Sequence, residues 1–413
     1  MMRILLVADM RSPHSVGWVH GLTEIGMDPV VVSSRRLSAT ERSRMPGHVR
    51  RQVVHEPTDG LSRARAFTTA HREVLGPVRG MARRRKTTMV SRPNDSTTPE
   101  GTGWIELPLE LNIARQLGRD VLSFAQRSKP QIVHALRIPF EGIAVTPIMS
   151  MWPTAISVWG SDLAQQAPAA TRLAAATRQS LASVRGVHAD CHRDVALARE
   201  WGAPMDAIGL VAAGNMGFDA DVFNTRGSRF SERQLIVCPR GHGSQFNYLG
   251  FLRVADRITR KYPNVCFIAA RLGGNPAAEK VRRESAHPDR IILTEHLPPR
   301  ELAHIYKKSL AVVSPSVSDG TPNSVLEGMS CGAVPIVGDI ASLRELLKEK
   351  LPGSLFDPLD EAQMERRLIE VLKTPESDWL EASETACRIA QGGWSREATQ
   401  SRVQAWYEQL ASP

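Results

Sequence analysis

The sequence predicts an α/β protein with two domains, each built on a parallel sheet. Three observations predict this class. The chain has 413 residues, which is more than one hydrophobic core usually organises. Short apolar runs alternate with segments of helical spacing along most of the chain. Polar loops follow these runs, and in open parallel sheets ligands bind at the carboxyl ends of the strands.

The first 33 residues predict a β-α-β unit. Strands are expected at 3–8 and 29–33, and the helix between them ends at Gly26. The loop after the first strand contains Ser12 and His14, and it should lie at the carboxyl edge of the sheet. A lone exposed histidine is often incidental, so position alone leaves open whether His14 belongs to a site.

Four more strands and two helices are expected to complete the first domain. The strands are expected at 131–135, 154–159, 186–189 and 210–213, and the helices at 107–126 and from 194 onward. The segment LRIPFEG, which contains Arg137 and Glu141, follows the strand that ends at His134 and Ala135 and reads as another edge loop. Asp162 follows a strand and a glycine turn, so it is expected to cap the next helix.

The second domain is predicted to begin near Arg229 and to repeat the pattern. Its first elements are strands at 235–238, 265–270 and 291–293 and helices at 248–261 and 299–308. Arg240 stands at a strand end beside a glycine-containing loop, from which a guanidinium can hold a diphosphate. A surface arginine is the alternative. The loops after the next two strands contain Arg271 and the pair His296 and Leu297.

The stretch from 314 to 345 organises the second domain. A strand at 311–313 leads into a polar loop, a helix at 322–331 and a further strand at 334–337. Thr321 is expected to be the N-cap of the helix, with Pro322 at its first position.

Two carboxylates in this stretch can face one cleft. Asp319 lies just before the predicted helix, and the Glu327 side chain tilts back toward the amino end of that helix. Between them, Gly320, Thr321 and Asn323 can offer backbone N–H groups to hydroxyls or phosphate oxygens. This combination suits a sugar. A capped core helix with one acidic residue on its exposed side is the alternative.

The formal charge of +9 is concentrated in one segment. Residues 37–100 contain 13 Arg or Lys against 6 Asp or Glu, including the run Arg83-Arg84-Arg85-Lys86. We interpret 37–103 as a basic insertion, either a solvated loop or a surface that contacts an anionic membrane or an acidic acceptor. Nucleic acid is disfavoured as a partner, because no recognition motif accompanies the charge.

Several other classes of protein are disfavoured by the sequence. Apolar runs are too short to span a membrane, and the opening MMRILLVADM is too quickly polar for a signal peptide, so a cytoplasmic protein is expected. The five cysteines lack metal-ligand spacing and are expected to be buried free thiols. A Walker lysine motif and a G-x-G-x-x-G after the first strand are both absent, which disfavours P-loop and dehydrogenase functions.

The spacing Asp319-x7-Glu327, within SDGTPNSVLEGMSCGAVPIV, resembles the E-x7-E signature of glycosyltransferase family 4. Further segments agree with the resemblance: the first 33 residues, PQIVHA, VWGSD, GNMGFDADVFN, CPRGHG and GGWSREA. The resemblance covers nearly the whole chain. It implies the GT-B fold, in which two Rossmann-like domains face a central cleft, and a retaining transfer reaction. The corresponding domains are 1–222, 223–390 and a terminal helix at 391–413 that crosses back to the first domain.

The resemblance also implies roles for particular residues. Glu327 would bind the ribose hydroxyls of the donor, Asp319 and the following backbone would bind the donor sugar, and Arg240 would hold the diphosphate. The implied catalytic group comprises Asp319, Arg240 and His14. The donor-binding group comprises Glu327, Gly320, Thr321, Pro322, Asn323, Ser324, His296, Leu297 and Arg271, and the acceptor side comprises Ser12, His134, Arg137, Glu141 and Asp162.

The sequence departs from the family pattern at three positions. The first signature residue is Asp319, one methylene shorter than the usual glutamate. The phosphate-binding lysine is replaced by Gln245-Phe246, and His242 or Arg271 could supply the missing charge. The second histidine of the usual H-x-H is Leu136.

The implied reaction transfers a sugar from a nucleotide-diphosphate sugar, with UDP favoured, to an acceptor hydroxyl. No cofactor and no metal are expected. The acceptor would be a saccharide, a lipid-linked molecule or a small molecule, and the protein could contact the inner face of a membrane peripherally. Two alternatives remain: a catalytically weak nucleotide-sugar-binding paralogue and a sugar-nucleotide epimerase.

Overall fold

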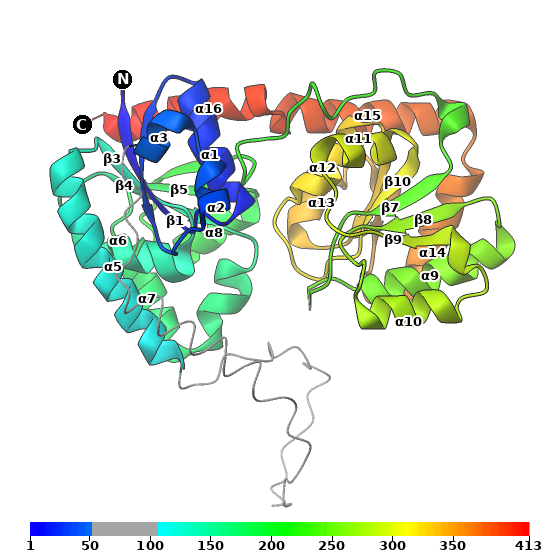
Figure 1. Cartoon of the computed structure of the whole chain (residues 1–413), viewed down its shortest axis with the longest axis horizontal. Coiled ribbons are helices and arrows are strands. Elements are labelled where there is room, and N and C mark those ends of the chain that lie inside the picture. The colour runs from blue at the N-terminus through cyan, green and yellow to red at the C-terminus, as the bar shows by residue number, and fades with distance from the viewer. Residues whose placement is uncertain (52–105, 244, 413) are drawn as a thin grey trace, which may run out of the picture.

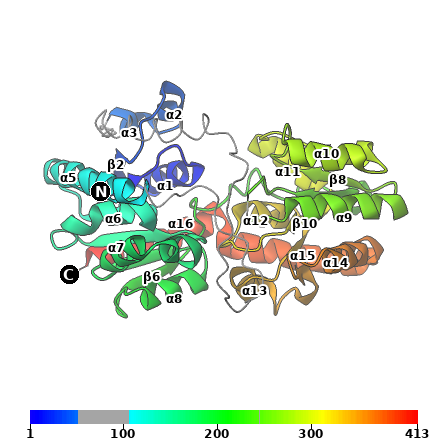
Figure 2. The same ribbon diagram turned by 90° about the horizontal axis from the view of Figure 1, so that it is seen from below.

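A computed structural model describes residues 1–51, 106–243 and 245–412. Two bodies lie side by side, each built around a parallel sheet, and the last two helices run along one edge of both (Figure 1). The chain starts in the first body and its end returns there (Figures 1 and 2). Most of the predicted basic insertion, including Arg83 to Lys86, lies outside the described residues.

The first sheet has six parallel strands in the order β2-β1-β3-β4-β5-β6. The strands are β1 (Arg3–Ala8), β2 (Asp28–Ser33), β3 (Ile132–Ala135), β4 (Thr154–Val158), β5 (Gly186–Ala189) and β6 (Ile208–Val211). β1 pairs with β2 on one side and with β3 on the other, so the strand order reverses next to β1. Ligands bind at such a switch point in doubly wound sheets, which places the loops after β1 and β3 at the expected site.

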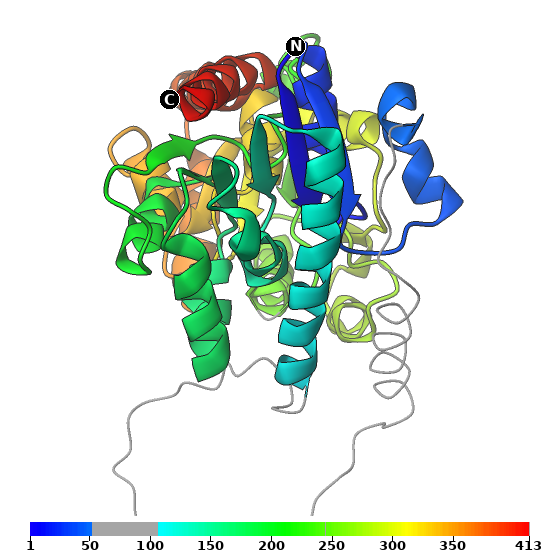
Figure 3. The ribbon, with the colours of Figure 1, turned by 90° about the vertical axis from the view of Figure 1, so that its left-hand side faces the viewer.

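Helices cover both faces of the first sheet, as a buried parallel sheet requires. They are α1 (Pro13–Glu24), α2 (Ala39–Ser43), α3 (Gly47–Arg51), α5 (Glu106–Ser128), α6 (Ile143–Val145), α7 (Thr171–Leu181) and α8 (His192–Glu200). α5 to α8 pack on one face, and α1 packs on the other beside the terminal helix α16 (Arg396–Ala411). In Figure 3, α16 lies in red across the top of this body.

The second sheet also has six parallel strands, in the order β12-β11-β10-β7-β8-β9. The strands are β7 (Leu235–Cys238), β8 (Cys266–Ala269), β9 (Ile291–Leu293), β10 (Ser309–Ser314), β11 (Val334–Gly338) and β12 (Leu355–Phe356). The order reverses between β7 and β10, so the loops after these two strands meet at the switch point.

Both faces of the second sheet are also covered. The helices are α9 (Tyr248–Lys261), α10 (Pro276–Glu284), α11 (Pro299–Lys307), α12 (Asn323–Ser330), α13 (Ala341–Leu347), α14 (Glu361–Lys373) and α15 (Glu376–Trp394). α9, α10 and α14 cover one face, and α11, α12, α13 and α15 cover the other. Ser395 caps α16 by accepting a hydrogen bond from the Ala398 N–H, and the chain then continues onto the first sheet.

Most predicted elements are present, and several have the predicted bounds, such as β1, β5, β7, β9 and α9. Two details of the predicted elements were wrong. The last strand of the first sheet is Ile208–Val211 rather than 210–213, because the strand begins where it pairs with Gly186. Thr321 is not the N-cap of α12, because Pro322 is extended (ψ 116°) and occupies the cap position itself. Several helices, among them α7, α10, α13 and α14, were not predicted.

The structure bears on two expectations from composition. All five cysteines are free, and Cys191, Cys238 and Cys331 are buried, whereas Cys266 and Cys387 are partly exposed. Among the described helices, none combines the length and the apolar character needed to cross a membrane.

Candidate active site

A cleft of about 550 Å³ lies between the two bodies, at the switch points of both sheets. Its walls include the predicted residues His14, Arg137, Arg240, Arg271, His296, Leu297, Asp319, Thr321, Pro322, Asn323, Ser324 and Glu327. The cleft therefore brings together most of the residues that the sequence selected, from segments more than 300 positions apart.

Arg240 is the centre of the wall formed by the second body. One terminal nitrogen donates to Asp319 Oδ2 at 2.7 Å and the other to Ser324 Oγ at 3.1 Å. The guanidinium carbon lies 4.4 Å from the centroid of the Phe246 ring, within cation–π range. Phe246 lies where the phosphate-binding lysine of the family was expected. This chain therefore has an aromatic ring that stacks on Arg240 in place of a second positive charge.

The Asp319 carboxylate is held by its surroundings. Oδ2 accepts from Arg240 and, at 3.3 Å, from Ser316 Oγ, while Oδ1 accepts from the Gly320 N–H at 3.0 Å. Ser342 Oγ donates to the Asp319 carbonyl at 2.9 Å and fixes the loop. The shortened side chain therefore points at Arg240, and its own position is set before any ligand binds.

Glu327 lies inside α12 and lines the same wall. Burial raises the pKa of its carboxyl to about 8, and the nearby Arg240 opposes that shift. At neutral pH the group is therefore mostly protonated and can both donate and accept a hydrogen bond, which suits a pair of hydroxyls.

Arg137 and Trp159 form the opposite wall, on the first body. Arg137 Nε donates to Asp162 Oδ1 at 3.1 Å, and its guanidinium carbon lies 5.7 Å from the Trp159 ring centroid. Asp162 is fully buried and also accepts from the Trp159 N–H at 3.0 Å. It does not cap the next helix, as the sequence suggested, because these contacts hold it behind Arg137 as a positioning residue.

His14 lines the cleft on the side of the first body, beside Trp159. Its ring packs 5.1 Å from the Trp159 ring, and burial, with a further effect of Arg240, lowers the pKa of the imidazole. His14 is therefore neutral near pH 7 and can act as a hydrogen-bond partner but not as a fixed cation.

His134 does not line the cleft, and its prediction as an acceptor-side residue was wrong. It has no exposed surface, and its two ring nitrogens contact Tyr407 Oη at 2.5 Å and Ser157 Oγ at 2.9 Å. The cause is strand alternation, because His134 lies inside β3 and points toward the face covered by α16. Leu136 is likewise buried in that core.

Three other predicted residues lie near the cleft without being part of its lining. Glu141 is buried and accepts a hydrogen bond from Ser34 Oγ, and burial raises its pKa to about 7. Ser12 precedes α1 and is partly exposed. Gly320 packs against the first body, where a Cβ would meet Asp190 Oδ1 at 2.0 Å. Glycine is therefore required at that position for the two bodies to approach.

Sequence reasoning missed Asp190, which follows β5 directly and lines the cleft. Burial, and then the nearby carboxylates of Asp194 and Asp319, raise its pKa to about 8. The available signal was its place immediately after a predicted strand, the same signal that selected Arg240.

Several polar atoms in the cleft lack partners. Of the buried side-chain polar atoms in the described part of the chain that make no hydrogen bond, four belong to cleft residues: His14 Nδ1, Trp159 Nε1, Asp190 Oδ1 and Arg240 Nε. Unpaired buried polar groups cost free energy, so their gathering at one place indicates a site for a polar ligand.

One described cluster has donor atoms close enough to hold a metal. Ligand atoms of Asp190, Cys191 and Asp194 lie within 4.8 Å of one another. However, Arg193 pairs with Asp194 at 2.8 Å, and burial raises the pKa of the Cys191 thiol, so both groups are poorly suited as metal ligands. Asp219 and Asp221 have the Asp-x-Asp spacing, but neither lines the cleft.

Two six-stranded parallel sheets whose switch points face one cleft define the GT-B class, and solved structures confirm this fold. Sucrose-phosphate synthase from Thermosynechococcus elongatus superposes with a TM-score of 0.70, covering 99% of both chains at 11% sequence identity. HepE of Anabaena, solved with UDP and glucose, gives a TM-score of 0.65 over 99% of this chain and 100% of its own, at 9% identity. The likeness at these identities is one of fold.

Two comparisons of sequence give a more particular likeness, each over only part of the chain. Residues 230–384 match the family described as Glycosyl transferases group 1. A D-inositol 3-phosphate glycosyltransferase of Frankia alni is 32% identical over 116 residues, which are 28% of this chain and 28% of that relative. The family match contains Arg240, Asp319 and Glu327, whereas the wall with His14 and Arg137 lies outside it.

Proposed function

We propose that this protein is a retaining glycosyltransferase of family 4 that moves a sugar from a nucleotide-diphosphate sugar, UDP-sugars first, to an acceptor hydroxyl. The observation that carries the proposal is the unit formed by Arg240, Asp319 and Ser324 at the start of α12, with Glu327 in the same wall. The family match over the second body and the UDP-bound structural neighbour support it.

The second body would hold the donor. Glu327 would bind the ribose hydroxyls, Arg240 the diphosphate, and Asp319 with the Gly320 backbone the sugar, while His296 and Leu297 would border the base. Arg240 Nε is buried and unpaired, so it can donate to a phosphate oxygen without the loss of the bonds to Asp319 and Ser324. The partial positive charge at the N-terminus of α12 adds to that of the guanidinium.

The reaction would occur on one face of the donor sugar. The bond between the anomeric carbon and the diphosphate oxygen breaks, the acceptor oxygen bonds to the same carbon, and the acceptor proton passes to the leaving diphosphate. Arg240 would stabilise the charge that develops on the diphosphate, and His14 and Asp190 would orient the hydroxyl groups. This scheme uses no resident metal, so activity should survive treatment with EDTA.

A calorimetric screen of UDP-, GDP-, ADP- and dTDP-sugars tests the proposal, followed by transfer assays with a panel of acceptors. We expect one donor to bind and its sugar to appear on an acceptor. Binding without turnover would favour the binding paralogue, and interconversion of the sugar nucleotide without transfer would favour an epimerase.

The placement of the ribose has its own test. Glu327→Ala should weaken binding of that nucleotide about 10-fold or more, because two hydrogen bonds are lost. Glu301→Ala, an exposed change on α11, is the control. Unchanged affinity in Glu327→Ala would place the ribose elsewhere.

A further inference from the structure

The Arg137 guanidinium is held in place but only partly used. Its Nε donates to Asp162 Oδ1 and its flat face lies against Trp159, while 38% of the side chain is exposed. Within the described residues, neither of its terminal nitrogens makes a hydrogen bond, and Arg137 lines the cleft. Its terminal nitrogens are therefore unpaired donors on a side chain that is held in place at the wall of the cleft.

The need to neutralise Asp162 does not by itself explain why Arg137 offers this carboxylate only its Nε–H group. A guanidinium that serves only a buried carboxylate gains most from two parallel hydrogen bonds. Here Asp162 takes one hydrogen bond from Nε and another from the Trp159 N–H, so one edge of the guanidinium is left over. Such an edge matches the paired oxygens of a phosphate or a carboxylate.

We propose that Arg137 binds an anionic oxygen group, a phosphate or a carboxylate, on the acceptor. The proposal rests on the proposed function, because it names the class of acceptor for the same cleft. His14 lines the same cleft as Arg240 and Arg137, and both guanidinium groups are close enough to affect its imidazole electrostatically. Arg240 would hold the donor diphosphate and Arg137 the acceptor anion, with the reacting hydroxyl near His14.

Paired acceptors that differ by one anionic group test this proposal. Transfer from the donor found in the calorimetric screen is measured for glucose and glucose 6-phosphate, myo-inositol and myo-inositol 1-phosphate, and glucose and glucuronate. The first two pairs test a phosphate on the acceptor, and the third pair tests a carboxylate. We expect kcat/KM to favour an anionic member, and Arg137→Gln to reduce that preference about 10- to 100-fold, the range of charge-assisted hydrogen bonds.

Further variants separate anion binding from folding. Arg137→Lys keeps the charge but loses the fork, so it should retain part of the preference. The double variant Arg137→Gln/Asp162→Asn removes both charges and leaves no buried carboxylate unpaired, and it should still lack the preference. Arg178→Gln is the matched control, because Arg178 lies over Trp201 at 4.6 Å on the same body but outside the cleft.

Two outcomes would overturn the proposal while leaving the proposed function intact: equal use of neutral and anionic acceptors by the wild-type protein, or an unchanged preference in the folded double variant. Nucleotide affinity is measured in every variant. If the wild-type protein bound none of the nucleotide sugars, the proposed function itself would be rejected.

Discussion

The ionisation of Glu327 can be used to test its burial in the cleft without any ligand. The pKa of its carboxyl is about 8 in the folded protein, against an ordinary value of 4.5, chiefly because of burial. Between these values the folded protein binds more protons than the unfolded chain. The free energy of unfolding should therefore fall as pH rises through this window, by at most about 1.4 kcal/mol per pH unit from this group.

Glu327→Gln should flatten that dependence. Urea unfolding at intervals from pH 5 to pH 8 measures it, and the difference between wild type and variant removes the parallel contribution of Asp190, whose pKa is also about 8. Glu301→Gln should leave the slope as it is. Parallel curves for wild type and Glu327→Gln would show that the carboxyl is ionised and solvated throughout this range.

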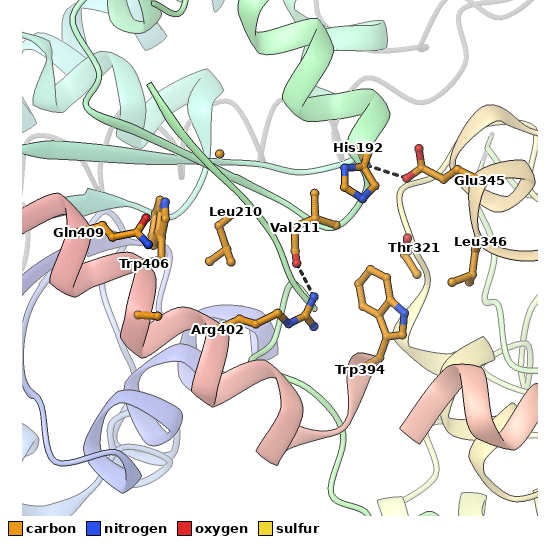
Figure 4. A pocket seen from close by; sticks show the side chains of 12 residues that line it. His192, Leu210, Val211, Thr321, Glu345, Leu346, Trp394, Arg402, Trp406 and Gln409 are labelled. Carbon is orange, nitrogen blue, oxygen red and sulfur yellow. Dashed lines mark hydrogen bonds between the residues drawn. The ribbon is translucent and has the colours of Figure 1, made fainter. Parts of the chain in front are cut away.

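At the scale of single elements, α8 depends on the other body for its N-terminal cap. Cys191 occupies the cap position and makes no side-chain capping bond. Instead, Glu345 of α13 accepts from the His192 N–H at 2.7 Å (Figure 4). It also accepts from the Arg193 N–H at 3.3 Å. A carboxylate at a helix N-terminus also interacts favourably with the helix dipole.

Glu345→Ala should therefore loosen the contact between the two bodies. We expect a loss of about 1 kcal/mol of stability, as for a lost helix cap, and a larger radius of gyration by small-angle X-ray scattering. Glu349→Ala, an exposed change just beyond the same helix, is the control. An unchanged scattering curve together with unchanged stability would show that the cap does not hold the two bodies together.

Local signals explain which parts of the site were predictable from the sequence. Arg240 lies just after the apolar strand β7, and Asp319 lies in the loop between the apolar strand β10 and α12, so chain position identified both. His134 lies inside β3, and its side chain points to the face of the sheet that α16 covers. The position of α16 is set by tertiary packing, so the local sequence did not show that His134 is buried. Asp190 also follows a strand directly, but its place beside Gly320 and Asp319 depends on the contact between the two bodies, which no local pattern contains. The stacking of Phe246 on Arg240 depends on the path of the loop between them.

At the scale of the whole molecule, α16 joins the end of the chain to the first sheet. Trp406 is 3% exposed, its Nε1 donates to the Ile208 carbonyl at 2.9 Å, and its ring lies 5.4 Å from that of His134. Arg402 donates to the Val211 carbonyl at 2.8 Å (Figure 4). The core of the first body is therefore completed by a helix that lies 198 residues beyond its last strand, as the pair Ile208 and Trp406 shows.

This arrangement predicts that damage to α16 unfolds the first body and spares the second. Trp406→Ala should cost about 3–5 kcal/mol, the usual range for truncating a buried tryptophan. The loss of stability should appear in the first body, whose core includes side chains of α16. The second body, which carries Arg240, Asp319 and Glu327, has a separate core around β7 and β10 and should stay folded. The variant should therefore bind nucleotide at temperatures where its acceptor wall has already melted.

Calorimetric scans with and without nucleotide can separate the two transitions, because a ligand raises the melting temperature only of the part that binds it. Gln409→Ala, exposed on the same helix, is the control. We expect Trp406→Ala to lower one transition and to leave the nucleotide-dependent transition in place. A single transition that falls as a whole would instead show that the two bodies unfold as one cooperative unit, with α15 and α16 acting as a continuous brace between them.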